Sequence, residues 1–409
     1  MSHDDTDPYP TRIGFAEAEA IVLREAAARR LPVQRLALAR AHGHVLARDV
    51  VAGIALPPFD NSAMDGFALR HADLAAAPAG LRLSGEQFAG PALDLALDAG
   101  GCIRITTGAP LPAGADTVVM RENTVCAGDL VQVLDAPRPG QHVRRAGEDV
   151  APGERVLEAG QVLTPARIAL AASLGVADLE VSARPTVAVF ATGDELVEPG
   201  LPLALGQVYN SNRELLMGLL RAEGLEPVAW PTLPDDPARI ASMLGDAAAS
   251  FDLVLTCGGV SAGEKDHLPD LVRRAGRIAF WKVRMRPGMP LLFGALGGGL
   301  LLALPGNPVS VLATWLALGR PLVDGLQGRT EPRLRLRARL AAPWHKRHAR
   351  LEFLRGRLQA GDDGVLRVVP NPADGSHRLR GAADSDALIV LPEGERESDA
   401  GETVEVLLY

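Results

Sequence analysis

Aromatic residues are scarce in this chain: phenylalanine, tryptophan and tyrosine together make up 4% of its 409 residues. Hydrophobic residues nevertheless reach 47%, an ordinary value for a globular protein. A sizeable core is therefore available, and we expect it to be aliphatic.

Cysteine is also rare. The three cysteines, Cys102, Cys126 and Cys257, are too few and too scattered for a disulfide framework or a zinc site. Their odd number is typical of a reducing compartment, so we expect a cytoplasmic protein.

The chain has no surplus of positive charge. The chain has 42 lysines and arginines against 50 acids, a formal net charge of −8. A general nucleic-acid binder needs a basic face to replace counterions, so this balance argues against that class. The arginine-rich stretch Arg333–Arg339 has no interleaved aromatic residues, and its alternation indicates an exposed strand face.

Long hydrophobic runs are absent as well. The longest candidate, Leu291 to Leu304, is interrupted by Gly294 and by the triplet that begins at Gly297. The first residues are acidic and polar, unlike a secretory signal. We therefore expect no membrane-spanning segment.

The length favours several domains, because one hydrophobic core rarely organises 409 residues. Changes in sequence texture indicate a multi-domain α/β plus β protein. We expect a helical and β linker domain from residues 1–50 and 141–183, with an inserted β-rich module at 51–140. A doubly wound α/β domain at 184–328 and a small, barrel-like β domain at 329–409 follow.

Helical periodicity predicts a first helix over Phe15–Arg30 and a further helical segment within Leu36–Asp49. Thr164 and Pro165 are typical of a helix start. Beyond residue 184 the predicted strands are Thr186–Ala191, Glu226–Trp230, Asp252–Thr256, Ile278–Val283, Leu291–Phe293 and Leu300–Leu304. The predicted helices are Ser211–Glu223, Asp236–Ala249, Leu268–Ala275 and Pro308–Leu318. This alternation implies parallel crossovers.

Three predicted strands of the α/β domain end in loops that carry glycine with polar side chains. Because ligands bind at the carboxyl ends of such strands, we expect these loops to form one site. Gly258 and Gly259 would let a phosphate approach bare backbone, with Ser261 as a hydroxyl donor. An ordinary strand-to-helix turn is the alternative. Asn307 and Pro308 open a helix whose N-terminus would suit an anion, although both residues also cap helices without a ligand.

Acidic residues follow the same strands. Asp194, Glu195 and Asp266 are predicted to lie on this edge of the sheet and to recruit Mg²⁺ beside a bound phosphate, because that ion prefers oxygen ligands. Asp235 and Asp236 precede a proline and are interpreted as helix caps.

Cations occupy alternate positions of one predicted strand: Lys282, Arg284 and Arg286. Period two places all three on one face, which suggests recognition of an oxyanion or phosphate. A solvated sheet edge guarded by charge is the alternative.

Together these loops resemble those of the bacterial molybdopterin molybdenumtransferases, a family whose eukaryotic relative is the C-terminal part of gephyrin. The motifs that carry the resemblance occur in family order and are Pro58–Gly66, Arg104–Gly108, Arg144–Asp149, Thr192–Glu195, Cys257–Asp266, Met285–Gly288 and Leu304–Pro308. They are spread across nearly the whole chain. Each is weak alone, and seven in register are a specific signal.

The resemblance implies an elongated homodimer whose active site lies between the α/β domain of one subunit and the N-terminal modules of the other. The implied reaction is the Mg²⁺-dependent insertion of molybdenum from molybdate into adenylylated molybdopterin, with release of AMP. Molybdopterin adenylyltransferase and proteins of molybdoenzyme maturation are the implied partners, and no nucleic acid or membrane is implied.

The resemblance also implies roles for single residues. The implied catalytic residues are Asp60, Thr107, Asp149, Glu195, Asp266, Lys282 and Arg286. The implied metal ligands are Asp194, Glu195 and Asp266. Binding of the cofactor precursor is implied for Gly258, Gly259, Ser261, Pro305, Asn307, Pro308, Arg355 and Ser376. Of these, Asp60, Thr107 and Asp149 would lie on the partner side of the cleft.

One departure from the family pattern affects the charge of the site. Met289 stands where many members have lysine, and Arg286 stands where some have lysine. Arginine retains the charge and adds a bidentate donor, whereas Met289 removes a cation. A tungstate-handling relative, a molybdopterin adenylyltransferase and a non-catalytic gephyrin-like scaffold remain the alternative interpretations.

Overall fold

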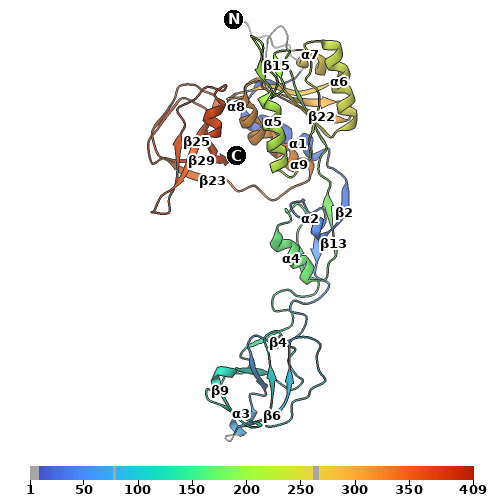
Figure 1. Cartoon of the computed structure of the whole chain (residues 1–409), viewed down its shortest axis with the longest axis vertical. Helices are drawn as coiled ribbons and strands as arrows, with labels where there is room; N and C mark the ends of the chain where they lie inside the picture. Colours follow the sequence, from blue (N-terminus) through green and yellow to red (C-terminus); the bar gives the residue numbers. More distant parts are fainter. Residues whose placement is uncertain (1–8, 77–79, 261–266) are drawn as a thin grey trace.

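The computed structural model describes residues 9–76, 80–260 and 267–409. The molecule is elongated, with the α/β domain and the C-terminal domain at one end and the inserted β module at the other (Figure 1). A small linker domain lies between them.

A seven-stranded sheet forms the centre of the α/β domain, in the order β1-β19-β21-β22-β18-β14-β17. Its strands are β1 (Thr11–Ile13), β14 (Val187–Ala191), β17 (Val228–Ala229), β18 (Leu253–Cys257), β19 (Gly276–Val283), β21 (Leu292–Leu296) and β22 (Gly299–Leu304). Alternate side chains of β14 enter opposite cores, Val187 and Val189 on one face and Ala188 and Phe190 on the other. Burial on both faces explains the continuous apolar runs.

Helices cover both faces of this sheet, as a doubly wound fold requires. The first face carries α1 (Phe15–Ala27), α5 (Ser211–Ala222), α8 (Pro308–Thr314) and α9 (Arg320–Leu326), and the second carries α6 (Pro237–Ser250) and α7 (Leu268–Ala275). The stretch Pro308–Leu326 passes a length and composition test for a membrane span, yet 78% of the tested window is buried inside the protein. A core helix of a globular domain has that burial.

The sheet is mixed rather than wholly parallel. Strand β21 runs antiparallel to both β19 and β22. Leu296 pairs with Gly299, so only two residues connect β21 to β22. Gly297 adopts a positive φ of 54° in that turn. A connection this short can join only antiparallel strands, which explains the departure from the predicted crossovers.

The N-terminal segment belongs to the α/β domain, which corrects the predicted assignment of residues 1–50 to the linker domain. Strand β1 pairs in parallel with β19. The apolar face of α1, including Ala18 and Val22, lies in the core shared with α9. Helical periodicity located α1 but could not show which domain buries it.

The linker domain contains two antiparallel strand pairs and two helices: β2 (Val33–Ala37) with β13 (Asp178–Ser182), β3 (Val50–Val51) with β12 (Arg155–Leu157), α2 (Leu38–Ala41) and α4 (Pro165–Ser173). Thr164 caps α4 as predicted, accepting a hydrogen bond from the Arg167 amide. The helical segment predicted within Leu36–Asp49 is wrong except for α2. Leu36 instead pairs with Leu179 in the β2–β13 ladder, a long-range contact that overrides local propensity.

The inserted module is a six-stranded sheet in the order β8-β5-β7-β6-β10-β9. Its strands are β5 (Gly66–Leu69), β6 (Leu81–Gln87), β7 (Gly101–Ile105), β8 (Thr117–Met120), β9 (Thr124–Ala127) and β10 (Leu130–Val133). A short pair, β4 (Asn61–Ser62) and β11 (Val143–Arg144), lies where the module meets the linker domain. The prediction of a β-rich module is confirmed.

The C-terminal domain closes into a barrel of β23 (Leu336–Leu340), β25 (Leu351–Ala360), β26 (Leu366–Pro370), β27 (Ala387–Leu391) and β29 (Thr403–Leu408). Pairing of β25 with β27 completes the closure. The barrel is joined to the α/β domain by β20 (Met285–Arg286), which pairs in parallel with the start of β25. The predicted barrel-like domain is confirmed.

Candidate active site

Three loops of the α/β domain meet at the carboxyl ends of neighbouring strands. Ala191 at the end of β14 pairs with Cys257 at the end of β18, and Cys257 pairs with Leu304 at the end of β22. The loops that follow therefore leave the sheet side by side. This juxtaposition was predicted from the order of the motifs.

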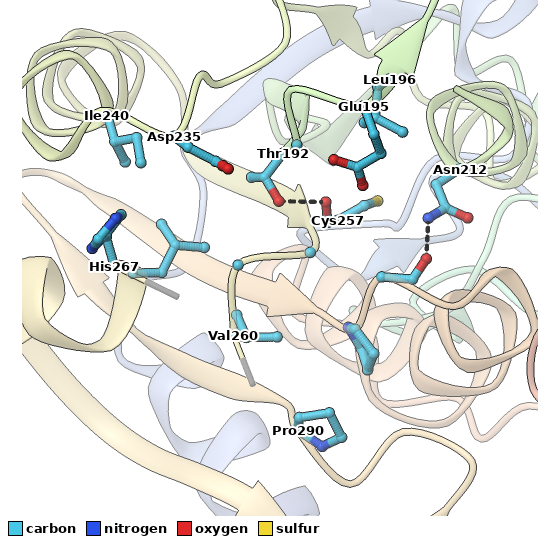
Figure 2. A pocket seen from close by; sticks show the side chains of 16 residues that line it. Thr192, Glu195, Leu196, Asn212, Asp235, Ile240, Cys257, Val260, His267 and Pro290 are labelled. Carbon is cyan, nitrogen blue, oxygen red and sulfur yellow. Dashed lines mark hydrogen bonds between the residues drawn. The ribbon is translucent and has the colours of Figure 1, made fainter. Parts of the chain in front are cut away.

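The loops enclose a cavity of about 380 Å³ (Figure 2). Its lining residues come from the three strand-end loops and the helices beside them. They are Thr192, Gly193, Glu195, Leu196, Asn212, Asp235, Ile240, Cys257, Gly258, Gly259, Val260, His267, Leu268, Pro290, Pro305 and Gly306. The volume is in the range of small-molecule sites.

The turn at Gly258 and Gly259 presents bare backbone to this cavity. Both residues have positive φ, 96° and 71°. A Cβ on Gly258 would lie 2.4 Å from the Thr192 hydroxyl oxygen, so the position tolerates no side chain. The backbone conformation and the lack of space both require glycine here. Because glycine has no side chain, an anion can reach the peptide groups of the turn.

Two carboxylates face the cavity. Glu195 and Asp235 both line it, and in Figure 2 they lie on either side of Thr192. Asp235 was interpreted as a helix cap, but the α6 cap is its neighbour Asp236, which accepts hydrogen bonds from the amides of Ala238 and Arg239. Only one of two adjacent acids can cap the helix, and Asp235 is the one left to reach the cavity.

Asp194 supports the loop from behind. One of its carboxylate oxygens accepts a hydrogen bond from the Asp235 amide at 3.3 Å. Asp194 is absent from the cavity lining, whereas Glu195 belongs to it. Ser261 and Asp266 lie outside the described residues. Within the ranges that the structure describes, no three His, Cys, Asp or Glu side chains converge as a metal site.

Neutral groups complete the lining. The Thr192 hydroxyl donates to the Cys257 carbonyl at 3.1 Å, and the Asn212 amide donates to the Gly306 carbonyl at 2.6 Å. The first bond joins two of the strand-end loops, and the second joins the third loop to α5. Burial raises the pKa of the Cys257 thiol far above its ordinary value, so this cysteine is no nucleophile. Asn212 carries no recognisable sequence signal, because it is contributed by the first turn of α5.

Lys282 lies beside the glycine turn. Its ammonium is 3.9 Å from the centroid of the Trp281 ring, and the Trp281 indole donates to the Val260 carbonyl at 3.0 Å. The lysine has a positive φ of 68°, a strained conformation for a residue with a side chain. Such strain is tolerated where the surroundings over-determine the backbone.

The predicted row of three cations on one face is wrong. The left-handed conformation of Lys282 interrupts the strand alternation on which the prediction depended. Arg284 pairs with Glu393 at 3.4 Å, and Arg286 pairs with Asp374 at 3.0 Å. Both arginines therefore hold the C-terminal domain against the α/β domain.

Comparison with known proteins covers nearly the whole chain. Residues 13–175 match the MoeA N-terminal region (domain I and II), residues 188–325 a probable molybdopterin binding domain, and residues 337–409 the MoeA C-terminal region (domain IV). The chain belongs to the MoeA family of molybdopterin molybdenumtransferases.

Individual MoeA relatives agree over their full length. The molybdopterin molybdenumtransferase of Haemophilus influenzae is 38% identical over 91% of this chain and 92% of its own. Molybdopterin molybdenumtransferase 2 of Mycobacterium tuberculosis is 41% identical over 90% of this chain and 93% of its own. A crystal structure of the Pyrococcus horikoshii molybdopterin biosynthesis moeA protein has a TM-score of 0.81 at 28% identity. It covers 97% of this chain and 100% of its own. The predicted resemblance is confirmed.

The C-terminal domain of this MoeA chain approaches the cavity through the start of α8. Arg355 is 2% exposed and donates to the carbonyls of Gly375 and Arg378. It thereby shapes the loop whose Ser376 carbonyl accepts the Val309 amide at 3.2 Å. Asn307 and Pro308 form the N-cap and first residue of α8, next to the cavity residues Pro305 and Gly306.

The position of Met289 is covered by a cation of the C-terminal domain. Arg350 places a guanidinium nitrogen 3.9 Å from the Met289 sulfur. The charge that methionine removes from this loop is therefore present nearby, on a different domain.

The remaining predicted residues cluster where the inserted module meets the linker domain. Asp60 accepts hydrogen bonds from the Ala146 amide at 2.8 Å and from Arg145 at 2.6 Å, and these bonds lower its pKa. Thr107 donates twice to Asp65, from its amide and its hydroxyl. Asp149 is exposed, and its amide donates to the Leu56 carbonyl on the same junction.

This junction and the cavity lie in different parts of one chain. Figure 1 shows the linker domain between the α/β domain and the inserted module. The structure therefore assembles the predicted residues into two separate groups. One surrounds the cavity, and the other contains Asp60, Thr107 and Asp149.

Proposed function

We propose that this MoeA protein inserts molybdenum from molybdate into adenylylated molybdopterin with release of AMP, as a Mg²⁺-dependent step of molybdenum cofactor biosynthesis. One observation carries the proposal: the carboxylates of Glu195 and Asp235 share a cavity with the bare turn at Gly258 and Gly259. Carboxylates that face a turn where a phosphate can reach the backbone amides suit the binding of a charged phosphate linkage and its counterion.

The glycine turn would receive a phosphate of the substrate. Backbone amides and a neighbouring cation are the usual partners of such a group. Lys282 is adjacent through Trp281 and Val260, so its ammonium is well situated for charge neutralisation. Binding there would place the AMP linkage beside the two acids. Attack of water on the phosphorus of the adenylate group would break the pyrophosphate P–O bond and release AMP, and the dithiol sulfurs would replace an oxygen of molybdate, which leaves as water.

The acids suit Mg²⁺ chemically. Glu195 and Asp235 line the cavity, Asp194 is bonded to the same loop, and all three offer oxygen ligands. Asp266 is a further proposed ligand. When bound, the ion would neutralise charge that develops on the phosphate oxygens. The role of the protein is to hold the carboxylates in position around the glycine turn.

A homodimer would complete the site. The group containing Asp60, Thr107 and Asp149 carries family motifs but lies beyond the linker domain from the cavity of its own chain. An elongated subunit can present that group to the cavity of a second copy by two-fold symmetry. We therefore propose that Asp60, Thr107 and Asp149 of the partner subunit face the substrate.

The direct test uses purified protein, adenylylated molybdopterin and Mg²⁺ with molybdate or tungstate, following AMP release. We expect AMP release with molybdate and its loss when Mg²⁺ is chelated. Release with tungstate alone would identify a tungstate-handling relative. Pterin binding without AMP release with either oxyanion would contradict the transferase proposal and favour a scaffold.

A further inference from the structure

A second cavity, of about 500 Å³, lies between the linker domain and the α/β domain. From the linker domain it is lined by β2 and by the segment around α2, including Gln34, Arg40 and His44. From the α/β side it is lined by the turn after α5, including Gly224 and Glu226. The connection between the domains, beginning at Arg184, passes along it.

We call this cavity between the two domains the hinge cavity. Cations dominate its lining. Arg40 and Arg184 both line it, and the charge of Glu226, the acid of the lining, acts on Arg184. His44 is 9% exposed, and its ring lies 3.4 Å from the His42 carbonyl, while its backbone bonds to Ala41 and Leu163. The single acid of the lining, Glu226, is exposed. A local surplus of positive charge is unusual in a chain whose net charge is −8.

Arg184 touches both domains at once. Its guanidinium lies against two glycine turns with positive φ, Gly43 of the linker domain and Gly224 of the α/β domain. A Cβ on Gly43 would lie 3.4 Å from a guanidinium nitrogen, and a Cβ on Gly224 only 2.9 Å from it. The guanidinium also donates to the His42 carbonyl, at 3.5 Å. Its position is therefore sensitive to the angle between the domains.

We propose that the hinge cavity binds a small phosphate monoester, held by Arg40, His44 and Arg184, and that the bound anion fixes the angle between the linker and α/β domains. Two guanidinium groups and an imidazole suit the tetrahedral oxygens of a phosphate. The volume exceeds the needs of a bare phosphate, and Leu36 and Pro185 offer an apolar wall for the organic part.

The linker domain is also fastened to the segment that follows α9. Arg167 on α4 forms a bidentate pair with Glu331, with both distances 2.8 Å, and Glu331 also accepts the Val162 amide at 3.0 Å. Glu331 belongs to the segment that connects α9 to the barrel. A ligand in the hinge cavity would add a second attachment between the linker and α/β domains.

Protonation of His44 should accompany binding. Burial and the charge of Arg184 lower the pKa of His44, with a smaller contribution from Arg40. A phosphate placed among these groups reverses the repulsion and favours the imidazolium, while Glu226 is the one acid of the lining. Glycerol 3-phosphate itself takes up a proton at about pH 6, so the contribution of His44 is the difference between the pH profiles of affinity in wild type and in His44→Gln. We expect the affinity of wild type to fall less steeply than that of the variant as pH is lowered below neutrality.

The experiment measures binding of glycerol 3-phosphate, a simple monoester, to the full chain by calorimetry, with malonate as the dicarboxylate control. We expect saturable binding of the monoester, weakened at least about tenfold in Arg40→Gln and in Arg184→Gln. Arg221→Gln, an exposed change on α5 outside the cavity lining, should bind like wild type. Arg40 is exposed, so its variant is expected to fold normally.

Small-angle scattering of the same samples tests the hinge. Glycerol 3-phosphate should narrow the distribution of molecular dimensions in wild type and Arg221→Gln, and leave Arg40→Gln unchanged. Equal affinity in wild type and Arg40→Gln would place the anion elsewhere, for example in the active-site cavity, and overturn the proposal. Binding with unaltered scattering would overturn the hinge role, and stronger binding of malonate would overturn the ligand class.

Discussion

Asp235 and Asp236 are neighbours in the sequence and separate in function. Asp236 satisfies the first amides of α6, and Asp235 lines the active-site cavity. The same residue type therefore caps a helix at one position and faces a cavity at the next.

Alanine at these two positions should separate the roles. Asp236→Ala is expected to lower the free energy of unfolding by about 1 kcal/mol, the usual effect of losing an N-cap, with AMP release nearly unchanged. Asp235→Ala should reduce AMP release by about 100-fold while the free energy of unfolding stays close to wild type. Urea unfolding and the AMP assay measure the two quantities. A reversed pattern would contradict the assignment of the cap and the cavity residue.

Gly258 illustrates a different constraint on a single residue. Its positive φ and the nearby Thr192 hydroxyl leave no room for a methyl group. We expect Gly258→Ala to destabilise the protein by about 1–3 kcal/mol and to impair phosphate binding. Gly245, inside α6 with nothing within 4 Å of a built Cβ, is the matched control. Gly245→Ala should stabilise by about 0.5–1 kcal/mol. Equal effects at both sites would show that the turn tolerates a side chain.

At the scale of structural elements, α4 is joined to the segment after α9 by the ion pair of Arg167 and Glu331. Arg167 holds the pKa of Glu331 at about 2, well below its ordinary value of 4.5. Because the folded-state pKa is depressed, the stabilisation is fully present above pH 4.5 and is lost as pH falls through about 2. The pair thus stays charged across the neutral range.

Removing the Glu331 charge should therefore weaken the docking of the linker domain. Glu331→Gln is expected to cost about 1–2 kcal/mol at pH 7, measured by thermal unfolding, and the difference from wild type should shrink as pH falls below 4.5. Glu180→Gln, in the linker domain that also contains Arg167, is the control, because its partner Arg48 is 72% exposed. An ion pair this exposed to water contributes little to the free energy of unfolding, about a few tenths of a kcal/mol. A pH-independent difference for Glu331→Gln would exclude the charged pair as its cause.

The whole molecule separates the two groups of predicted site residues by the length of the linker domain. A functional site that needs both groups must combine two chains. The hypothesis of a site shared between two subunits can therefore be tested without a structure of the dimer.

Subunit complementation is the corresponding test. Asp60→Asn and Glu195→Gln are each expected to abolish AMP release in the homodimer, because each removes one half of every site. Mixed and refolded together, the two variants should recover about a quarter of wild-type activity, since about half of the dimers are mixed and one of their two sites is intact. A site built within one chain would show no recovery. Refolded wild type is the reference for losses during mixing.

The sequence by itself determined the local elements and the motifs. The central strands have continuous apolar sequences because both of their faces are buried. Thr164 and Pro165 predict the start of α4. Helix α7 begins and ends where periodicity and breakers placed it. The order of strands and loops was enough to predict that Gly258, Glu195 and Pro305 meet, because parallel strands present their carboxyl ends at one edge.

Only the tertiary structure decided which partner each element takes. The periodicity of α1 does not say which core buries it, and Leu36 joins a strand because Leu179 lies opposite, far along the chain. Arg284 and Arg286 have the alternation of a binding face, yet acids of the barrel pair with them. Long-range contacts of this kind depend on how domains meet, and no local pattern encodes that. The separation of the predicted site residues into two groups follows from the same cause.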